Sequence, residues 1–321
     1  MSALTTFSSL SSSQTGLIEP ADRALFSDVN VRPFCYRHRL ALELPLTLPD
    51  IAALNDRLPD GDAFKGWQNG VTQIEDGWRT RPSERLTLAD TIAGIETNHS
   101  LVVLKHIEQD SVVGPALRNL LQEIFDYSSS RFRKDVVLGE CLVFLNSPGR
   151  KTAYHFDLEA SFLLQIAGTK TVHAWPCGDP QVVAESEVEA YCGAGNLSAA
   201  VYKPDLQKLA QTYLLEPGDG VHFPSLGPHW VQNGDTVSIS INVNYDLRSL
   251  HGSLRPILAL NHRLEKLGLR PRRPGASLLS DKAKATAWTV ARNAKTLARR
   301  VIARRRNGEG YPVWMPEHRI G

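Results

Sequence analysis

Cysteine is scarce in this chain, and long apolar runs are missing. The 321 residues include four cysteines, no two of them at the C-x-x-C spacing of a zinc ribbon. Scattered thiols are typical of a reducing compartment, so we expect a cytoplasmic protein in which Cys35, Cys141, Cys177 and Cys192 stay unpaired. No apolar run approaches the ~20 residues that cross a bilayer, so we expect no membrane span. Residues 1–16 are rich in Ser and Thr and lack the basic start and apolar centre of a secretory signal.

Net charge is nearly absent overall, but it is unevenly distributed. The sequence has 36 Lys+Arg against 34 Asp+Glu. Residues 251–321 carry 16 basic and 4 acidic side chains, a net of +12, which leaves −10 for the 250 residues before them. The C-terminal segment therefore has a separate role. Three roles stay open: packing or dimerisation through its helices, binding of an anionic partner such as nucleic acid, and contact with a membrane surface.

Helix and strand signals are mixed in the first 135 residues. We expect a loosely ordered N-terminus over residues 1–30 and α/β elements over residues 31–135 that pack on the core. Alternating apolar residues predict strands, and apolar stripes with a period near 3.6 predict helices. The predicted strands are 39–44 and 101–104, the predicted helices are 51–58 (with Asp50 as its cap), 87–96 and 111–127, and residues 61–81 are expected to form a loop.

A period of two dominates residues 136–250, with a polar insert at 179–204. Short strands separated by Gly- and Pro-containing turns indicate an all-β sandwich or barrel. Helical periodicity returns at 256–267 and 281–306, within a basic helical segment over residues 251–321. The fold class is therefore mainly β with flanking helices. The predicted strands are 137–145, 151–157, 161–166, 170–175, 212–215, 221–224 and 237–245.

A metal-binding pattern lies at the end of one predicted strand. His155 and Asp157 are two residues apart, so both side chains leave the same face of the strand. His229 follows where a strand resumes; His222, on the strand before it, is the less favoured third ligand. Two histidines and one carboxylate on one side of a metal leave the other side open, an arrangement that suits non-haem Fe(II).

Further polar residues are expected inside the same barrel. Lys170 begins a strand fifteen residues after His155, and a buried cation there needs a carboxylate partner from the protein or from a ligand. Asn242 and Asn244 share one face of a strand otherwise suited to burial, so their amides need hydrogen-bond partners too. Together these residues indicate a ligand site.

Five motifs follow one another between residues 152 and 244. They are Thr152-x-x-His155-x-Asp157, residues 162–170 ending in Gly168-x-Lys170, Glu216-Pro217-Gly218-Asp219, Phe223-Pro224 with His229, and Ser240-Ile241-Asn242-Val243-Asn244. In this order they resemble the JmjC, cupin-like 2-oxoglutarate oxygenases, in the branch of single-domain hydroxylases and their bacterial relatives. The likeness covers about residues 136–247, and it is weaker in the helices on either side.

The resemblance implies a double-stranded β-helix (cupin or jelly-roll) core over residues 136–250. It implies that His155, Asp157 and His229 hold Fe(II), with 2-oxoglutarate and O2 as co-substrates and ascorbate as a possible reductant. Lys170 and Thr152 would bind the far carboxylate of 2-oxoglutarate. An amide near the co-substrate would be Asn244, with Asn242 as second choice. Thr152 is out of phase with His155 on a regular strand, so its role requires a bulge.

The expected function is hydroxylation of a protein or peptide side chain or of a small metabolite; demethylation would use the same site. Two alternatives remain. One is a cupin-like metal protein without 2-oxoglutarate chemistry. The need of Lys170 for an anion argues against it. The other is a non-catalytic module whose basic tail binds nucleic acid. A homodimer through the C-terminal helices is a further expectation, which the resemblance supports.

Overall fold

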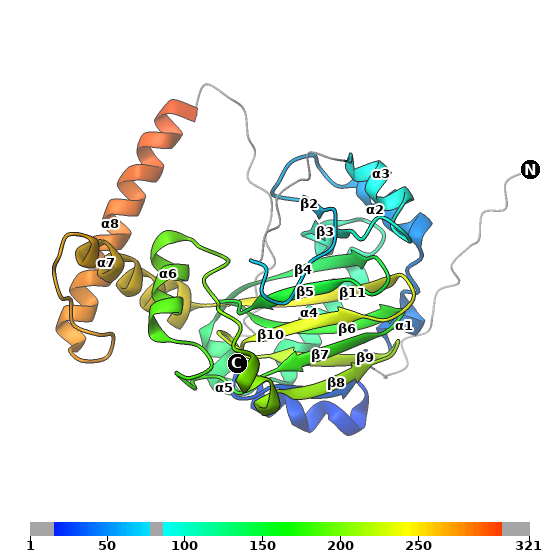
Figure 1. Ribbon diagram of the computed structural model, residues 1–321, viewed down its shortest axis with the longest axis horizontal. Coiled ribbons are helices and arrows are strands. Elements are labelled where there is room, and N and C mark those ends of the chain that lie inside the picture. Colours follow the sequence, from blue (N-terminus) through cyan, green and yellow to red (C-terminus); the bar gives the residue numbers. More distant parts are fainter. Residues whose placement is uncertain (1–15, 78–85, 304–321) are drawn as a thin grey trace, which may run out of the picture.

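Two antiparallel sheets form the centre of the computed structural model, which describes residues 16–77 and 86–303 (Figure 1). Eight strands between residues 136 and 247 build the core of both sheets. The larger sheet contains β4 (Val136–Asn146), β6 (Ala160–Ala167), β9 (Asp219–Phe223) and β11 (Ser238–Leu247). The smaller sheet contains β5 (Lys151–His155), β7 (Lys170–Ala174), β8 (Gln211–Leu215) and β10 (His229–Asn233).

The chain passes back and forth between the two sheets. β4, β6, β9 and β11 are interleaved in sequence with β5, β7, β8 and β10, and each sheet is antiparallel throughout, in the orders β9-β6-β11-β4 and β5-β10-β7-β8. This is the winding of a double-stranded β-helix, or jelly roll. The predicted fold class is confirmed: a mainly β protein with flanking helices.

Strand β11 shows how the sequence pattern positions the site. Its alternation places one set of side chains on each face of the larger sheet. The apolar set is fully buried in the main hydrophobic cluster, and the polar set faces the space between the sheets, as the sequence predicted. The apolar set is Ile239, Ile241, Val243 and Tyr245, and the polar set is Ser240, Asn242 and Asn244.

Three strands from the first half of the chain extend the larger sheet. β1 pairs with β9, and β3 pairs with β4 and β2. β3 was predicted, whereas β2 lies within residues 61–81, where a loop was expected. The strands are β1 (Phe34–Arg37), β2 (Lys65–Gln68) and β3 (Leu101–Lys105).

Helices of the first half cover the outer face of this sheet. The apolar stripe of α4 (Gly114–Tyr127) is fully buried at Leu117 and Leu121, and the Tyr245 hydroxyl of β11 donates to the Leu121 carbonyl at 2.6 Å. The remaining α-helices here are α1 (Leu40–Glu43), α2 (Leu48–Arg57), α3 (Leu88–Ala93) and α5 (Ser130–Asp135); the 3-10 helices are η1 (Pro20–Asp28) and η2 (Ile107–Gln109).

Three expectations for the N-terminal part differ from the structure. The strand predicted at 39–44 is the short helix α1, because Leu, Ala and Glu are good helix formers and Leu40 needs only one turn to reach the core. Helix α2 starts three residues before the predicted one, and a capping box between Thr47 and Asp50 closes its N-terminus. Within the expected loose N-terminus, residues 16–30 pack on the core, with Phe26 fully buried.

Helices also form a projecting C-terminal unit. α6 (Glu185–Ala194) forms within the polar insert and packs on α7 (Arg255–Lys266), which follows the π-helix η4 (Ser249–Leu254) and packs on α8 (Leu278–Ala303) (Figure 1). The Arg263 guanidinium lies 4.5 Å from the centre of the Trp288 ring. The arginines at 304–306 lie outside the described residues, and dimerisation or nucleic-acid binding by this unit stays a prediction. Within residues 16–77 and 86–303, no helix combines the length and apolar character needed to cross a bilayer.

Candidate active site

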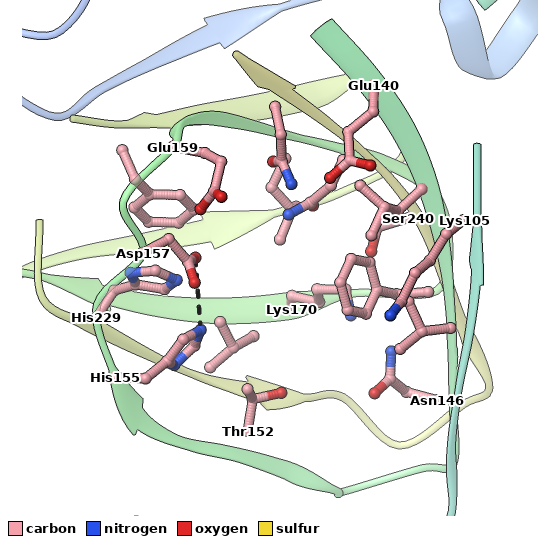
Figure 2. Close-up of a pocket in the computed structure, with 18 of the residues that line it drawn as sticks. Lys105, Glu140, Asn146, Thr152, His155, Asp157, Glu159, Lys170, His229 and Ser240 are labelled. Atoms are coloured by element: carbon pink, nitrogen blue, oxygen red, sulfur yellow. Dashed lines mark ion pairs between the residues drawn. The ribbon is translucent and has the colours of Figure 1, made fainter. Parts of the chain in front are cut away.

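A cavity of about 380 Å³ lies between the two sheets. Strands β3, β4 and β11 of the larger sheet line one side of it, and β5, β7 and β10 of the smaller sheet line the other. All seven residues singled out from the sequence as site residues line this cavity: Thr152, His155, Asp157, Lys170, His229, Asn242 and Asn244. Figure 2 shows His155, Asp157 and His229 at one end, with Lys170 toward the middle.

The two histidines and the aspartate come together on the smaller sheet. His155 ends β5, and His229, its register partner, begins the neighbouring β10. The carboxylate of Asp157 lies 3.8 Å from His155 Nε2, and one ligand atom from each of the three residues lies within 4.8 Å of the other two. Both imidazoles are nearly fully buried, with 6% of His155 and 5% of His229 exposed.

Backbone carbonyls fix the tautomer of both histidines. His155 Nδ1 lies 2.8 Å from the Ala153 carbonyl, and His229 Nδ1 lies 2.9 Å from the Gly227 carbonyl. A carbonyl only accepts hydrogen bonds, so each Nδ1 carries the proton and each Nε2 keeps its lone pair. Metal-binding histidines are oriented in this way.

Burial keeps His229 short of protons. Burial lowers the pKa of His229 well below its usual value, and the neighbouring charge of His155 lowers it further. The two rings are 4.3 Å apart, and the His229 ring also stacks on Phe223 at 4.0 Å. A neutral imidazole is the form that binds a metal. Two Nε2 lone pairs and one carboxylate therefore fit a divalent ion such as Fe(II).

A bulge in β5 brings Thr152 into the cavity. Between the register pairs His229–His155 and Val231–Thr152, β10 advances two residues while β5 advances three. The extra residue turns Thr152 to the same side as His155. In the view of Figure 2 the Thr152 side chain lies lower than His155, His229 and Lys170. The bulge required by the sequence argument is therefore present.

Lys170 is a buried cation without a carboxylate. Only 3% of the residue is exposed, and its ammonium donates to the amide oxygen of Asn233 at 2.7 Å. Among the described residues no carboxylate lies within ion-pair distance of it. Burial lowers the pKa of the Lys170 ammonium to about 7. An anion that entered the cavity would restore the charged form.

Polar atoms of β11 also face the cavity without partners. Ser240 Oγ, Asn242 Oδ1 and Asn244 Oδ1 are buried and accept or donate no hydrogen bond within the described structure. Buried polar atoms in this state are rare in folded proteins. Their number in one cavity indicates a ligand that supplies the missing partners.

Two other histidines near the sheets, His222 and His173, have packing roles. The Nε2 atom of His222 accepts from the Asn30 amide at 2.9 Å, and its Nδ1 lies 2.9 Å from the Ser161 carbonyl. Burial lowers its pKa to about 3, and no nitrogen remains for a metal. His173 is on the outer face of β7, stacked on Trp230 at 4.1 Å. Their positions leave His229 as the histidine that lies beside His155 and Asp157.

Comparison with known proteins gave a limited result. No family model matches the chain, and no curated protein matches it. The X-ray structure of YcfD from Escherichia coli is 14% identical, with a TM-score of 0.47 over 86% of this chain and 68% of that chain. The structure of YcfD, a ribosomal oxygenase from Escherichia coli, in complex with cobalt and 2-oxoglutarate is 14% identical, with a TM-score of 0.46 over 86% and 67%. A mutant of the Bacillus subtilis oxalate decarboxylase OxdC is 17% identical, with a TM-score of 0.24 over 34% and 22%. Since such folds carry many activities, the function depends on the residues of the site.

Two residues that bear on this site, Asn233 and Glu140, were not singled out from the sequence. Asn233, the partner of Lys170, also donates to the Arg150 carbonyl at 2.7 Å, so it fixes the ammonium in position. Glu140 enters from β4, directly opposite Asn244 in the sheet register. The sequence did contain a signal for Glu140, because a glutamate at an inward-facing position of a mainly apolar strand is unusual. Asn233 gave no signal, because its importance comes from a contact made across strands.

Proposed function

We propose that the chain is an Fe(II)- and 2-oxoglutarate-dependent oxygenase. One observation carries the proposal: a single cavity holds both a two-histidine, one-carboxylate cluster and a buried lysine without a carboxylate partner among the described residues. A metal cluster alone fits many cupin-like proteins. The lysine adds a need for an anion that a metal-only function would leave unmet.

His155, Asp157 and His229 would hold the iron. Their carbonyl-fixed tautomers keep two nitrogen lone pairs ready, which removes the need for the rings to reorient when the metal binds. When bound, Fe(II) with 2-oxoglutarate and O2 supplies the chemistry that converts a substrate C–H bond to C–OH, with succinate and CO2 as the other products.

Lys170 and Thr152 would bind the far carboxylate of 2-oxoglutarate. The ammonium supplies the positive charge, and the Thr152 hydroxyl on the bulge of β5 supplies a second donor. Asn233 holds the ammonium while the site is free of ligand. Asn244, with Asn242 as the second choice, would contact the co-substrate from the opposite sheet. The apolar side chains of Leu163, Phe223 and Val231 would exclude water from the same space.

The residues of the cavity described so far fit several classes of substrate. Hydroxylation of a protein or peptide side chain and hydroxylation of a small metabolite both fit a cavity of this size. Removal of an N-methyl group is hydroxylation next to nitrogen and would use the same residues.

Succinate formation tests the proposal. Purified protein with Fe(II), ascorbate, O2 and 2-oxoglutarate should release succinate, and His155→Ala and Lys170→Ala should abolish the release. His173→Ala and Lys208→Ala are matched controls, because His173 faces away from the cavity and Lys208 is exposed. Both controls should retain the activity.

The alternative functions predict other outcomes. A cupin-like metal protein without 2-oxoglutarate chemistry would bind the metal but show no heat of 2-oxoglutarate binding in calorimetry. A non-catalytic module would show neither succinate nor metal-dependent binding of 2-oxoglutarate. Either result would refute the oxygenase proposal.

A further inference from the structure

A second, smaller pocket lies outside the cavity between the sheets. It has a volume of about 140 Å³ and forms where the turn between β4 and β5 meets the segment after β2 and the segment before β3. None of its lining residues lines the larger cavity. Its volume is that of a few water molecules, so it fits one small ion or head group. The lining includes Thr72, Gln73, His99, Gly149, Arg150 and Lys151.

Arg150 is a buried cation without a carboxylate partner. Only 4% of the residue is exposed, and its guanidinium donates to neutral oxygens alone: the carbonyls of Gly70 and His99 and, at 2.6 Å, the side-chain oxygen of Gln68. Its Nε atom is buried and has no acceptor within the described structure. No carboxylate among the described residues forms an ion pair with it. These contacts hold neighbouring segments together but leave the positive charge without a counter-ion.

The surroundings of Arg150 disfavour its charge. Burial lowers the pKa of the Arg150 guanidinium from 12.5 to about 10, and the charge of Asp76 opposes this shift only in part. Asp76 is exposed, and its carboxylate already accepts from the Gln73 amide at 2.6 Å. A guanidinium stays protonated at pH 7 even with this pKa. The charge therefore persists in the folded protein, and a nearby anion would stabilise it.

A second cation lines the same pocket. Lys151 begins β5 directly after Arg150, and in the part of the chain that the structure describes it forms no ion pair. The exposed imidazole of His99 and the Thr72 hydroxyl add hydrogen-bond donors. Asp76 is the only acid among the described residues whose charge acts on Arg150. Positive charge and donors therefore exceed negative charge around this pocket.

The backbone around the two cations is held in place. The Arg150 carbonyl accepts from the Asn233 amide at 3.0 Å and from Asn233 Nδ2 at 2.7 Å, and the Gly149 amide donates to the Gly234 carbonyl at 2.8 Å. Gly149 has a φ of 64°, a left-handed conformation that glycine adopts without strain. Because the turn is fixed before a ligand arrives, binding costs little conformational entropy.

We infer that this pocket is a binding site for a phosphate group, which Arg150 and Lys151 neutralise and to which His99 and Thr72 donate. A phosphate monoester carries nearly two negative charges at pH 7, which match the two cations. It also offers several acceptor oxygens to the donors of the pocket, and arginine and lysine are the side chains that commonly bind it. The site lies outside the cavity between the sheets, so the inference does not depend on the proposed function.

Calorimetric titration with inorganic phosphate tests the inference. The metal-free full chain is used both as the parent and as Lys170→Met, which removes the other buried cation that could attract phosphate. Both proteins should bind phosphate at one site in the millimolar range or more tightly, and acetate, a single charge, at least about tenfold more weakly. Methyl phosphate and dimethyl phosphate then distinguish the source of the group. Tighter binding of methyl phosphate indicates a terminal phosphate, and equal binding of the two indicates a phosphodiester.

Substitutions then locate the binding. Lys151→Met should weaken phosphate about tenfold, as the loss of one charge-assisted hydrogen bond predicts, and Asp76→Asn should strengthen it by roughly twofold to fivefold by removing a repelling charge near the surface. Lys208→Met removes an exposed cation elsewhere and should have no effect. Arg150→Gln should abolish binding. If that variant fails to fold, the Lys151 and Asp76 variants decide.

Two results would overturn the inference. One is the absence of saturable phosphate binding to the parent and to Lys170→Met at millimolar concentration. The other is phosphate binding that neither Lys151→Met nor Asp76→Asn changes. In either case the Arg150 guanidinium would serve only to join the segments at Gly70 and His99 to the turn between β4 and β5.

Discussion

Replacing Lys170 with methionine should stabilise the metal-free protein while it removes 2-oxoglutarate binding. The side chain is 3% exposed and lies beside a neutral amide, with burial as the cause of its low pKa. A buried lysine without a carboxylate partner lowers folding stability, and under the proposed function its charge is needed only for a ligand. Methionine has a similar length and flexibility but carries no charge, so it fills the same space.

The magnitude follows from the pKa. Burial lowers the pKa of Lys170 from 10.5 to about 7, so between these values the unfolded chain binds more protons than the folded chain, and stability rises with pH. At pH 7 the folded state is less stable by about 4 kcal/mol than it would be with an unperturbed lysine. The methionine variant recovers this energy but leaves the Asn233 oxygen without its donor, a loss of about 2 kcal/mol. The net gain is about 2 kcal/mol at pH 7.

Urea unfolding of metal-free protein without 2-oxoglutarate measures this gain. At pH 7 the midpoint of unfolding should lie at a higher urea concentration for the variant than for the parent. The difference should shrink by about 2 kcal/mol at pH 9, where the parent lysine is neutral in the folded chain. Calorimetry of the metal-loaded variant should show no heat of 2-oxoglutarate binding.

A second buried lysine provides the control. Lys65 is 8% exposed, and its ammonium reaches the exposed carboxylate of Asp60 at 2.7 Å. Lys65→Met should therefore bring no stabilisation, since its charge is already paired near solvent. The argument from burial is wrong if Lys170→Met is less stable than the parent at pH 7. It is also wrong if the variant's increase in the free energy of unfolding is the same at pH 9 as at pH 7.

Three further predictions concern the co-substrate and the core. Affinity for 2-oxoglutarate should fall about tenfold per pH unit above pH 7, because the protein must first protonate Lys170, whose pKa is about 7 in the free protein; calorimetry from pH 6 to pH 9 checks this, and Lys170→Arg should bind with no such slope. Thr152→Val should raise the KM for 2-oxoglutarate by roughly twofold to tenfold, equivalent to one hydrogen bond, with little change in kcat. A fall in kcat as large as the rise in KM would contradict a role in binding alone. Phe26→Ala should lower the free energy of unfolding by about 3–5 kcal/mol in urea titrations, because the ring is fully buried and stacks on Phe162 at 5.8 Å; a loss under about 1 kcal/mol would mean that the N-terminal segment is not part of the core.

Strand periodicity accounts for much of the fold that the sequence predicted. Strand β11 alternates over its length, so its two faces and their environments follow from the sequence alone. The bulge at Thr152 followed from the resemblance, which assigned Thr152 to the cavity: a threonine three residues before His155 can face the cavity only if the strand gains a residue.

Short and context-dependent elements escaped prediction. The segment at Leu40 alternates like a strand, yet one helical turn buries the same leucine, and sequence periodicity over six residues cannot separate the two. Helix α6 was not predicted within the polar insert, because the partner that it packs on is α7, more than sixty residues later in the chain. Asn233 reaches Lys170 through a cross-strand contact, which no local pattern records.

The two sheets carry different parts of the cavity, and this has an evolutionary consequence. The proposed metal ligands, Thr152 and Lys170 belong to the smaller sheet or its adjoining loop, whereas Glu140 and the β11 amides belong to the larger one. Under the proposed function, residues on β4 and β11 could therefore change and accept new substrates while the proposed metal ligands stay in place. A directed-evolution library restricted to inward positions of these two strands would sample the same route, with retained succinate formation as its first selection.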